Sequence, residues 1–200
     1  SEDGLVYTFS IIPEIPWVRV NQDSGEVEQV MDMDGNPLFV TANDYAYGMT
    51  RSMDPRNASY YGSILAGWVE GGNDLYGSLD EAADDASEED LASMVESTMG
   101  GVNLVVVDDY TLQVTIVQPA GFAAQILGMW MAAAQPQSVV DEYGDAWTEA
   151  ENIVTYGPFA LAEWSHGERT VMVKNPFWPG SDGIPVPSVD GVVNTILEPE

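Results

Sequence analysis

A chain of 200 residues, 45% of them hydrophobic, is long enough to bury a core of its own. Its 33 acidic residues far outnumber its five basic residues, and the resulting formal net charge of -28 at pH 7 argues against nucleic acid and anionic lipid headgroups as partners. The chain has no cysteine, which excludes disulfides, thiol catalysis and cysteine-ligated zinc.

The acidic excess also bears on the setting in which the protein works. Like charges on a compact chain repel one another and lower its stability unless salt screens them. The composition therefore indicates a salty, acidic or extracytoplasmic setting. The opening SEDGLVYTFS shows no basic start followed by an apolar run, so we expect any export signal to have been removed.

The first predicted elements are a strand, a hairpin and a helix. Apolar and polar residues alternate over residues 5–11, which predicts a strand. A hairpin excursion follows, and we interpret residues 16–33 as an insertion. The clearest helix is predicted over residues 41–54, because Thr41 and Asp44 form a T-x-x-D capping arrangement and a proline follows.

The rest of the chain alternates between helical and strand patterns. The predicted elements are a short helix in 59–69, an acidic helical segment over 78–99, a hairpin over 102–117, an apolar helix over 121–134, a short helix in 137–147, strands on both sides of His166, and a closing strand over 190–199. The apolar helix falls short of the roughly 20 residues that cross a bilayer. We therefore predict a mixed α+β fold with a largely antiparallel sheet and flanking helices.

Searches for catalytic and metal-binding motifs give negative results. His166 directly follows Ser165 within the turn WSHGE and no G-x-S-x-G is present, so we interpret it as a surface turn histidine. A single histidine cannot build a zinc site. An EF-hand reading that places Gly35 at the sixth position puts Val30 first and Thr41 twelfth, where carboxylates are required. We predict no catalytic residue, no metal and no cofactor.

Paired carboxylates leave one enzymatic alternative open. Asp108 and Asp109 are neighbours at a hairpin turn, and the acidic block over 84–89 reads as a solvated helix face. Such pairs are expected by chance in a chain with 33 acids. An acidic secreted hydrolase domain that uses a carboxylate pair therefore remains as an alternative, and a stand-alone adhesive or scaffolding module is another.

Aromatic side chains near helix ends carry more information. Tyr60 and Tyr61 open the second predicted helix, Trp68 closes it, and Trp130 interrupts the apolar helix. Amphipathic rings at such positions are common at ligand clefts and also in ordinary cores.

Several segments of the chain resemble, in the expected order, the oligopeptide-binding family of ABC-transporter solute-binding proteins, bacterial family 5. They are TANDYAYGMTRSMDPRNASYYGSILAG, VVVDDYTLQVTIVQPAGFAAQIL, SVVDEYGDAWTEAENIVTYGPFALAEWSHGERTVMVKNPFW and VDGVVNTILEPE. The block that ends in KNPFW is the most specific, and in that family it is scaffold. The resemblance therefore implies a structural role for His166.

The resemblance implies a type II, periplasmic-binding-protein-like fold in which two lobes close on a solute. Residues 1–178 would form a subdomain of lobe I, and residues 179–200 a connector and a strand returning to the missing part of that lobe. Implied partners are a peptide or similar small solute, the ABC permease subunits, and the missing second lobe of the same chain. The implied location is extracytoplasmic, either periplasmic or anchored at the cell surface.

The resemblance also implies ligand-binding residues. The segment SYYGS matches the S-P-Y-A-S of the family, so Tyr61 takes the tyrosine position at the cleft rim and Tyr60 replaces the usual proline. The segment around Trp130 resembles another part of the rim. Tyr61, Tyr60 and Trp130 are therefore the predicted ligand-binding residues.

Overall fold

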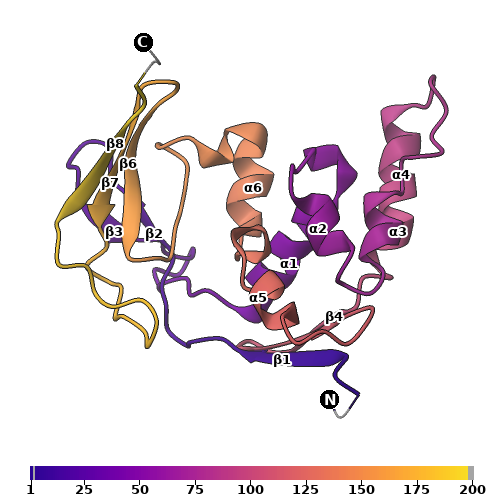
Figure 1. The fold of residues 1–200 in the computed structure, drawn as a ribbon. Coiled ribbons are helices and arrows are strands. Elements are labelled where there is room, and N and C mark those ends of the chain that lie inside the picture. Colours follow the sequence, from indigo (N-terminus) through magenta and orange to yellow (C-terminus); the bar gives the residue numbers. More distant parts are fainter. Residues whose placement is uncertain (2, 198–200) are drawn as a thin grey trace. The chain divides into compact units, whose positions relative to one another are not determined.

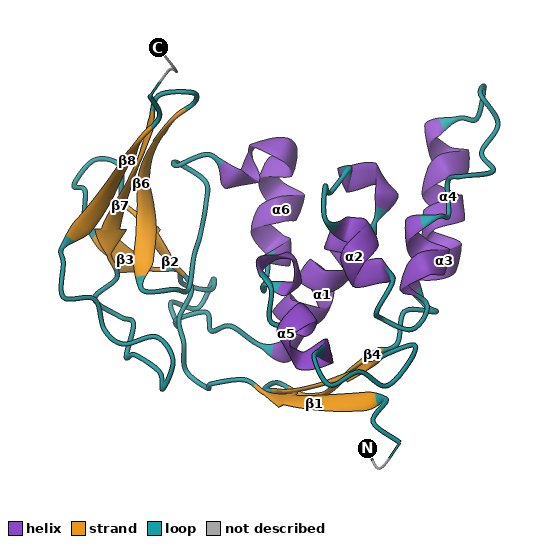
Figure 2. Cartoon of the chain, viewed as in Figure 1, coloured by secondary structure: helices purple, strands orange, loops and turns teal. Residues whose placement is uncertain are grey.

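The structure is a computed structural model that describes residue 1 and residues 3–197. The chain folds into two compact units, which we call unit 1 (Ser1–Ile11 and Thr41–Gln135) and unit 2 (Ile12–Val40 and Pro136–Glu200). Figure 1 follows the chain from end to end, and Figure 2 distinguishes its helices from its strands. The end of the predicted closing strand, residues 198 and 199, lies outside the described residues.

Unit 1 combines a three-stranded antiparallel sheet, in the order β1-β5-β4, with helices on one of its faces (Figure 1). Its elements are β1 (Val6–Ser10), α1 (Ala42–Met53), η1 (Pro55–Asn57), α2 (Gly62–Ala66), α3 (Gly72–Tyr76), α4 (Glu88–Met99), β4 (Leu104–Asp108), β5 (Thr111–Thr115), α5 (Ala123–Leu127) and η2 (Trp130–Ala132).

The core of unit 1 lies between this sheet and the helices. Leu112 and Val114 alternate with half-buried polar residues along β5, as the predicted hairpin requires, and their side chains are buried. They belong to one apolar cluster with Met49 and Met53 of α1 and Leu65 of α2. The apolar residues that alternate along the strand and those that recur along the helices therefore pack into a single core.

Side-chain caps begin the two longest helices of unit 1. The carboxylate of Asp44 accepts hydrogen bonds from the backbone N–H and the hydroxyl of Thr41, at 2.8 and 3.0 Å. At α4 the Ser87 hydroxyl donates to Asp90 Oδ2 at 2.6 Å and accepts from the Asp90 N–H at 3.2 Å. Helix α4 thus begins at the later of its two predicted starts, and the expectation of helix over 78–86 is wrong, because the chain forms turns there.

The predicted apolar helix over 121–134 is also wrong in its extent. Helix α5 ends at Leu127, and after Gly128 the chain turns extended at Met129, with φ -76° and ψ 161°, before the single turn of η2. The segment then runs against α1, where Gln135 N–H donates to the carbonyl oxygen of Asp44 at 3.1 Å. The chain after Gly128 therefore packs against α1 and does not continue the regular helix that its apolar composition favours, because tertiary packing overrides helix propensity.

Unit 2 is built from a three-stranded antiparallel sheet, in the order β6-β7-β8, and a two-stranded antiparallel ribbon. Its elements are β2 (Val18–Val20), β3 (Val27–Gln29), α6 (Gln137–Tyr143), η3 (Gly144–Thr148), β6 (Phe159–Ser165), β7 (Arg169–Lys174) and β8 (Gly191–Thr195). All strand pairs among the described residues are antiparallel, and the predicted α+β class is confirmed.

The segment 16–33, interpreted above as an insertion, supplies part of the core of unit 2. Val18 and Val20 of β2 are buried together with Ala160 of β6. Trp17 is buried and meets the ring of Tyr156 edge to face at 5.1 Å. Whether or not relatives share this segment, unit 2 depends on it for packing.

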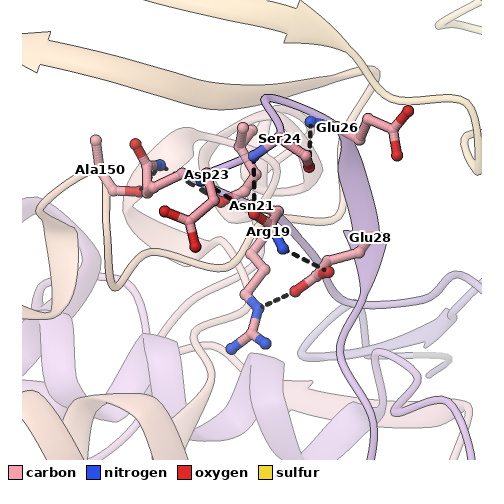
Figure 3. Close-up of polar contacts among 9 residues, drawn as sticks. Arg19, Asn21, Asp23, Ser24, Glu26, Glu28 and Ala150 are labelled. Atoms are coloured by element: carbon pink, nitrogen blue, oxygen red, sulfur yellow. Dashed lines mark hydrogen bonds and ion pairs between the residues drawn. The ribbon is translucent and has the colours of Figure 1, made fainter.

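Polar contacts fix the ribbon of β2 and β3 (Figure 3). Arg19 Nε donates to Glu28 Oε1 at 2.8 Å, and Asn21 Nδ2 donates to Glu28 Oε2 at 3.3 Å. These two donors, Arg19 above all, hold the pKa of Glu28 below its usual value. Gln22 Nε2 donates to the carbonyl oxygen of Ala150 at 3.0 Å, so the turn is also tied to the segment that follows η3.

His166 lies on the surface at the turn between β6 and β7. Its ring stacks on Trp164 with centroids 4.2 Å apart, and its Nε2 lies 3.0 Å from Glu149 Oε2. The Ser165 hydroxyl donates to Glu163 instead of to the histidine. Ser165 and His166 therefore do not form the hydrogen-bonded pair that nucleophilic catalysis by serine requires.

Across the described residues, no helix combines the length and the apolar character needed to span a bilayer.

Candidate functional site

Three aromatic side chains from two separate segments of unit 1 meet at its surface. The rings of Tyr60 and Tyr61 lie edge to face with centroids 4.9 Å apart, and those of Tyr61 and Trp130 do so at 5.3 Å. Tyr60 is 88% exposed, Tyr61 38% and Trp130 64%. We call these three residues the aromatic cluster. Its exposed rings offer flat apolar surface to solvent, as aromatic residues at ligand-binding sites often do.

A tight turn between α1 and α2 places the two tyrosines. Asp54 ends α1, and its carboxylate accepts from the Arg56 N–H at 2.9 Å, which caps η1. Ala58 then adopts φ 46° and ψ 36°, a left-handed conformation that costs a residue with a side chain about 1 kcal/mol. Tyr61 follows as the N-cap residue of α2. The cap at Asp54 and the left-handed residue Ala58 therefore fix the turn that positions the two tyrosines.

An ion pair closes this turn. Arg56 Nε lies 3.0 and 3.1 Å from the two carboxylate oxygens of Asp54, and Arg56 Nη2 lies 2.6 Å from Oδ2. The Asp54 carboxylate is buried, and its hydrogen bonds raise the pKa of the Arg56 guanidinium above its ordinary value. Two-pronged contacts of this kind fix geometry as well as charge.

Two glycines bring both halves of the aromatic cluster onto α1. A Cβ atom at Gly62, the first residue of α2, would lie 2.4 Å from the carbonyl oxygen of Ser52. A Cβ atom at Gly48 would lie 2.2 Å from the carbonyl oxygen of Ala133, just after η2. Only glycine permits such close approach of two backbones. Helix α1 is therefore the shared support of the tyrosine turn and of the segment that carries Trp130.

Replacing Gly48 by alanine is expected to lower the free energy of unfolding by about 1 to 3 kcal/mol, since the new methyl group must push the chain around Ala133 away from α1. The gain in helix propensity, about 1 kcal/mol, offsets only part of this cost. Urea denaturation followed by tryptophan fluorescence measures the change. Gly100→Ala is the control, because its Cβ would have no neighbour within 4 Å; an equal effect of the two substitutions would refute the close contact.

The structure brings together all three residues that the sequence predicted as ligand-binding, although their role in binding stays a prediction. Trp68, singled out with them, lies elsewhere in unit 1 and meets Phe122 edge to face at 5.1 Å. Sequence reasoning missed the two supporting glycines. Gly48 could have been noticed, because a glycine inside a helix is unfavourable and needs a packing reason.

The carboxylates do not converge on a second site. Asp108, Asp109 and the acids over 84–89 are exposed. Among the residues that the structure describes, Asp54 is the only buried carboxylate, and Arg56 binds it. Nor do three or more histidine and carboxylate side chains gather in the described residues in a way that could hold a metal ion. The geometry gives no support to a hydrolase that uses two opposed carboxylates.

Comparison with known proteins places the chain in a family. The profile of the bacterial extracellular solute-binding proteins, family 5 Middle, matches residues 1–200. The periplasmic oligopeptide-binding protein of Escherichia coli is 30% identical over 180 residues, which are 89% of this chain and 27% of that protein. A probable deoxycholate-binding periplasmic protein of the same organism is 32% identical over 143 residues, 72% of this chain and 23% of its own length.

Solved structures agree on the fold. A periplasmic oligopeptide-binding protein from Borrelia burgdorferi superposes with a TM-score of 0.70 at 21% identity, over 98% of this chain and 32% of that one. The chain thus spans about a third or less of the length of the relatives that it matches. The family consists of solute-binding proteins and not of enzymes. The match over residues 1–200 shows that the chain belongs to the bacterial extracellular solute-binding proteins of family 5.

Proposed function

We propose that this chain is part of an extracytoplasmic solute-binding protein that delivers peptides, or solutes of similar size, to an ABC permease in the membrane. The family match over residues 1–200 is the observation that carries this proposal. The names of the relatives support it, since the first describes an oligopeptide-binding protein and places it in the periplasm. The protein would be periplasmic or anchored at the cell surface, and its missing second lobe would complete the solute site.

In such a protein the work is done by binding and not by a chemical step. Two lobes close on the solute, and the solute favours the closed state only to the extent that it contacts that state better than the open one. The aromatic cluster would supply part of that difference from lobe I. Its rings are exposed in the described structure, and burial against a solute would remove their apolar area from water.

Replacing Tyr61 by alanine in the full-length protein is expected to weaken the binding of short peptides by about 1 to 3 kcal/mol, the usual cost of truncating an aromatic contact. Tyr61 is at the centre of the aromatic cluster, so its loss also removes the support of Tyr60 and Trp130. Isothermal titration calorimetry measures the affinity.

The matched control is Tyr143→Ala. Tyr143 is 40% exposed, close to the 38% of Tyr61, and it lies on α6 in unit 2, outside the aromatic cluster. Its replacement is expected to leave affinity unchanged. Equal losses for the two variants would remove Tyr61 from the site, and a full-length protein that binds no short peptide would refute peptide delivery as its function.

A further inference from the structure

The charges of unit 1 are almost all of one sign. Residues 1–11 and 41–135 contain 16 acidic residues, two arginines and neither lysine nor histidine, so 16 negative charges against two positive ones leave a formal net charge of -14. Charges act over about 10 Å at 0.1 M salt. A solute that approaches unit 1 therefore meets a net negative charge, which favours cations over anions.

Both arginines of unit 1, Arg51 and Arg56, already have hydrogen-bond partners within the chain. Arg56 binds the buried carboxylate of Asp54 through two guanidinium nitrogens, and the negative charge of Glu96 acts on it as well. Arg51 Nη1 donates to Gln135 Oε1 at 3.2 Å, on the segment that follows η2. An anionic solute would have to compete with these internal partners, whereas a cationic solute would not.

The aromatic cluster itself has an affinity for positive charge. Tyrosine and tryptophan rings carry a negative face that attracts ammonium and guanidinium groups, by about 0.5 to 2 kcal/mol according to exposure. Tyr60 and Trp130 are more than half exposed, so their rings are open to a bound solute. Ring attraction and the net charge of unit 1 favour the same sign of ligand.

We propose that the aromatic cluster makes this protein select cationic peptides, those with lysine or arginine side chains, over acidic peptides. This inference rests on the proposed function and specifies its solute class. It also separates the two kinds of solute named among the relatives, because a bile-acid anion such as deoxycholate would be repelled by a unit of net charge -14.

Calorimetry on the full-length protein tests the proposal with tripeptides that carry lysine, norleucine or glutamate at each position in turn. At low salt, about 0.05 M, we expect the best lysine peptide to bind at least about fivefold more tightly than its norleucine and glutamate counterparts. The preference should shrink at about 1 M salt, where the screening length falls to about 3 Å. Equal affinities, or a preference for glutamate, would overturn the proposal.

Two variants decide whether the preference belongs to the aromatic cluster. Trp130→Leu keeps an apolar side chain but removes the ring, and we expect the lysine preference to fall by about threefold or more. Phe122→Leu is the control, because Phe122 is an exposed ring of the same charged unit and lies in the separate pair with Trp68. A preference that both variants preserve would place the selectivity outside the cluster and overturn the proposal.

The proposed function and the inference fail in different ways. If short peptides bind without regard to charge, the proposed function stands and the cationic selectivity is wrong. If none of the tripeptides binds, whatever its charge, the cationic selectivity is wrong and so is peptide delivery as the proposed function.

Discussion

Gly71→Ala is expected to lower the free energy of unfolding by roughly 3 to 5 kcal/mol, at the upper end of single substitutions. Gly71 has φ 78°, in the region that favours glycine, and a Cβ there would lie 2.0 Å from the carbonyl oxygen of Gly101. The carbonyl carbon of Gly101 is only 2.6 Å away, so the collision is with backbone and cannot be relieved by a rotamer change.

The position of Gly71 explains why the damage would spread through unit 1. Gly71 is the N-cap residue of α3, and the preceding Glu70 donates its backbone N–H to the carbonyl oxygen of Thr115 and accepts from the Asn103 N–H, at 2.9 Å each. Moving this corner would therefore strain the attachment of α3 to the sheet. Urea denaturation followed by circular dichroism and tryptophan fluorescence gives the loss of stability.

Gly25→Ala separates strain from collision. Gly25 has φ 74°, close to that of Gly71, but a Cβ there would have nothing within 4 Å. We expect Gly25→Ala to cost only about 1 kcal/mol, the price of the left-handed conformation alone. If the two substitutions cost the same, the close contact between Gly71 and Gly101 does not exist in solution.

Local signals in the sequence predicted much of the fold, and contacts between distant segments account for most of the rest. The cap of α1 at Thr41 and Asp44 and the hairpin of β4 and β5 follow from residues close together in the chain, and both are present. Helix α3 and the break after Gly128 were missed, because short helices and extended segments owe their form to tertiary packing.

The candidate site divides in the same way. Tyr60, Tyr61 and Trp130 were selected by resemblance to a family, and no local pattern indicates that residues 61 and 130 meet. Their meeting depends on two close approaches to α1: Gly48 of α1 lies against Ala133, and Gly62 of α2 lies against Ser52 of α1. In the sequence, a close approach of two backbones is visible only as a glycine. Most glycines occur for other reasons, such as turns and helix ends, so this signal does not identify the contact.

Asn175→Leu is the second substitution with a large expected effect, a loss of roughly 2 to 4 kcal/mol, because it removes both hydrogen bonds of a buried side-chain amide. Asn175 is 1% exposed. Its Nδ2 donates to the carbonyl oxygen of Gly157 at 2.8 Å, and its Oδ1 accepts from the Phe177 N–H at 2.9 Å. Leucine has a similar volume, so lost hydrogen bonding and not a cavity would dominate the result.

The amide of Asn175 joins the two ends of the β6–β7 hairpin, which gives a physical reason for the conspicuous KNPFW block. Gly157 lies before β6 and Phe177 after β7, and the backbone N–H of Asn175 also donates to Pro158 at 2.9 Å. Asn57→Leu is the control, since Asn57 is exposed and water can replace its bond to Arg51, so we expect less than about 1 kcal/mol. A small effect of Asn175→Leu in urea denaturation would mean that water reaches this site, and the block would then need another explanation.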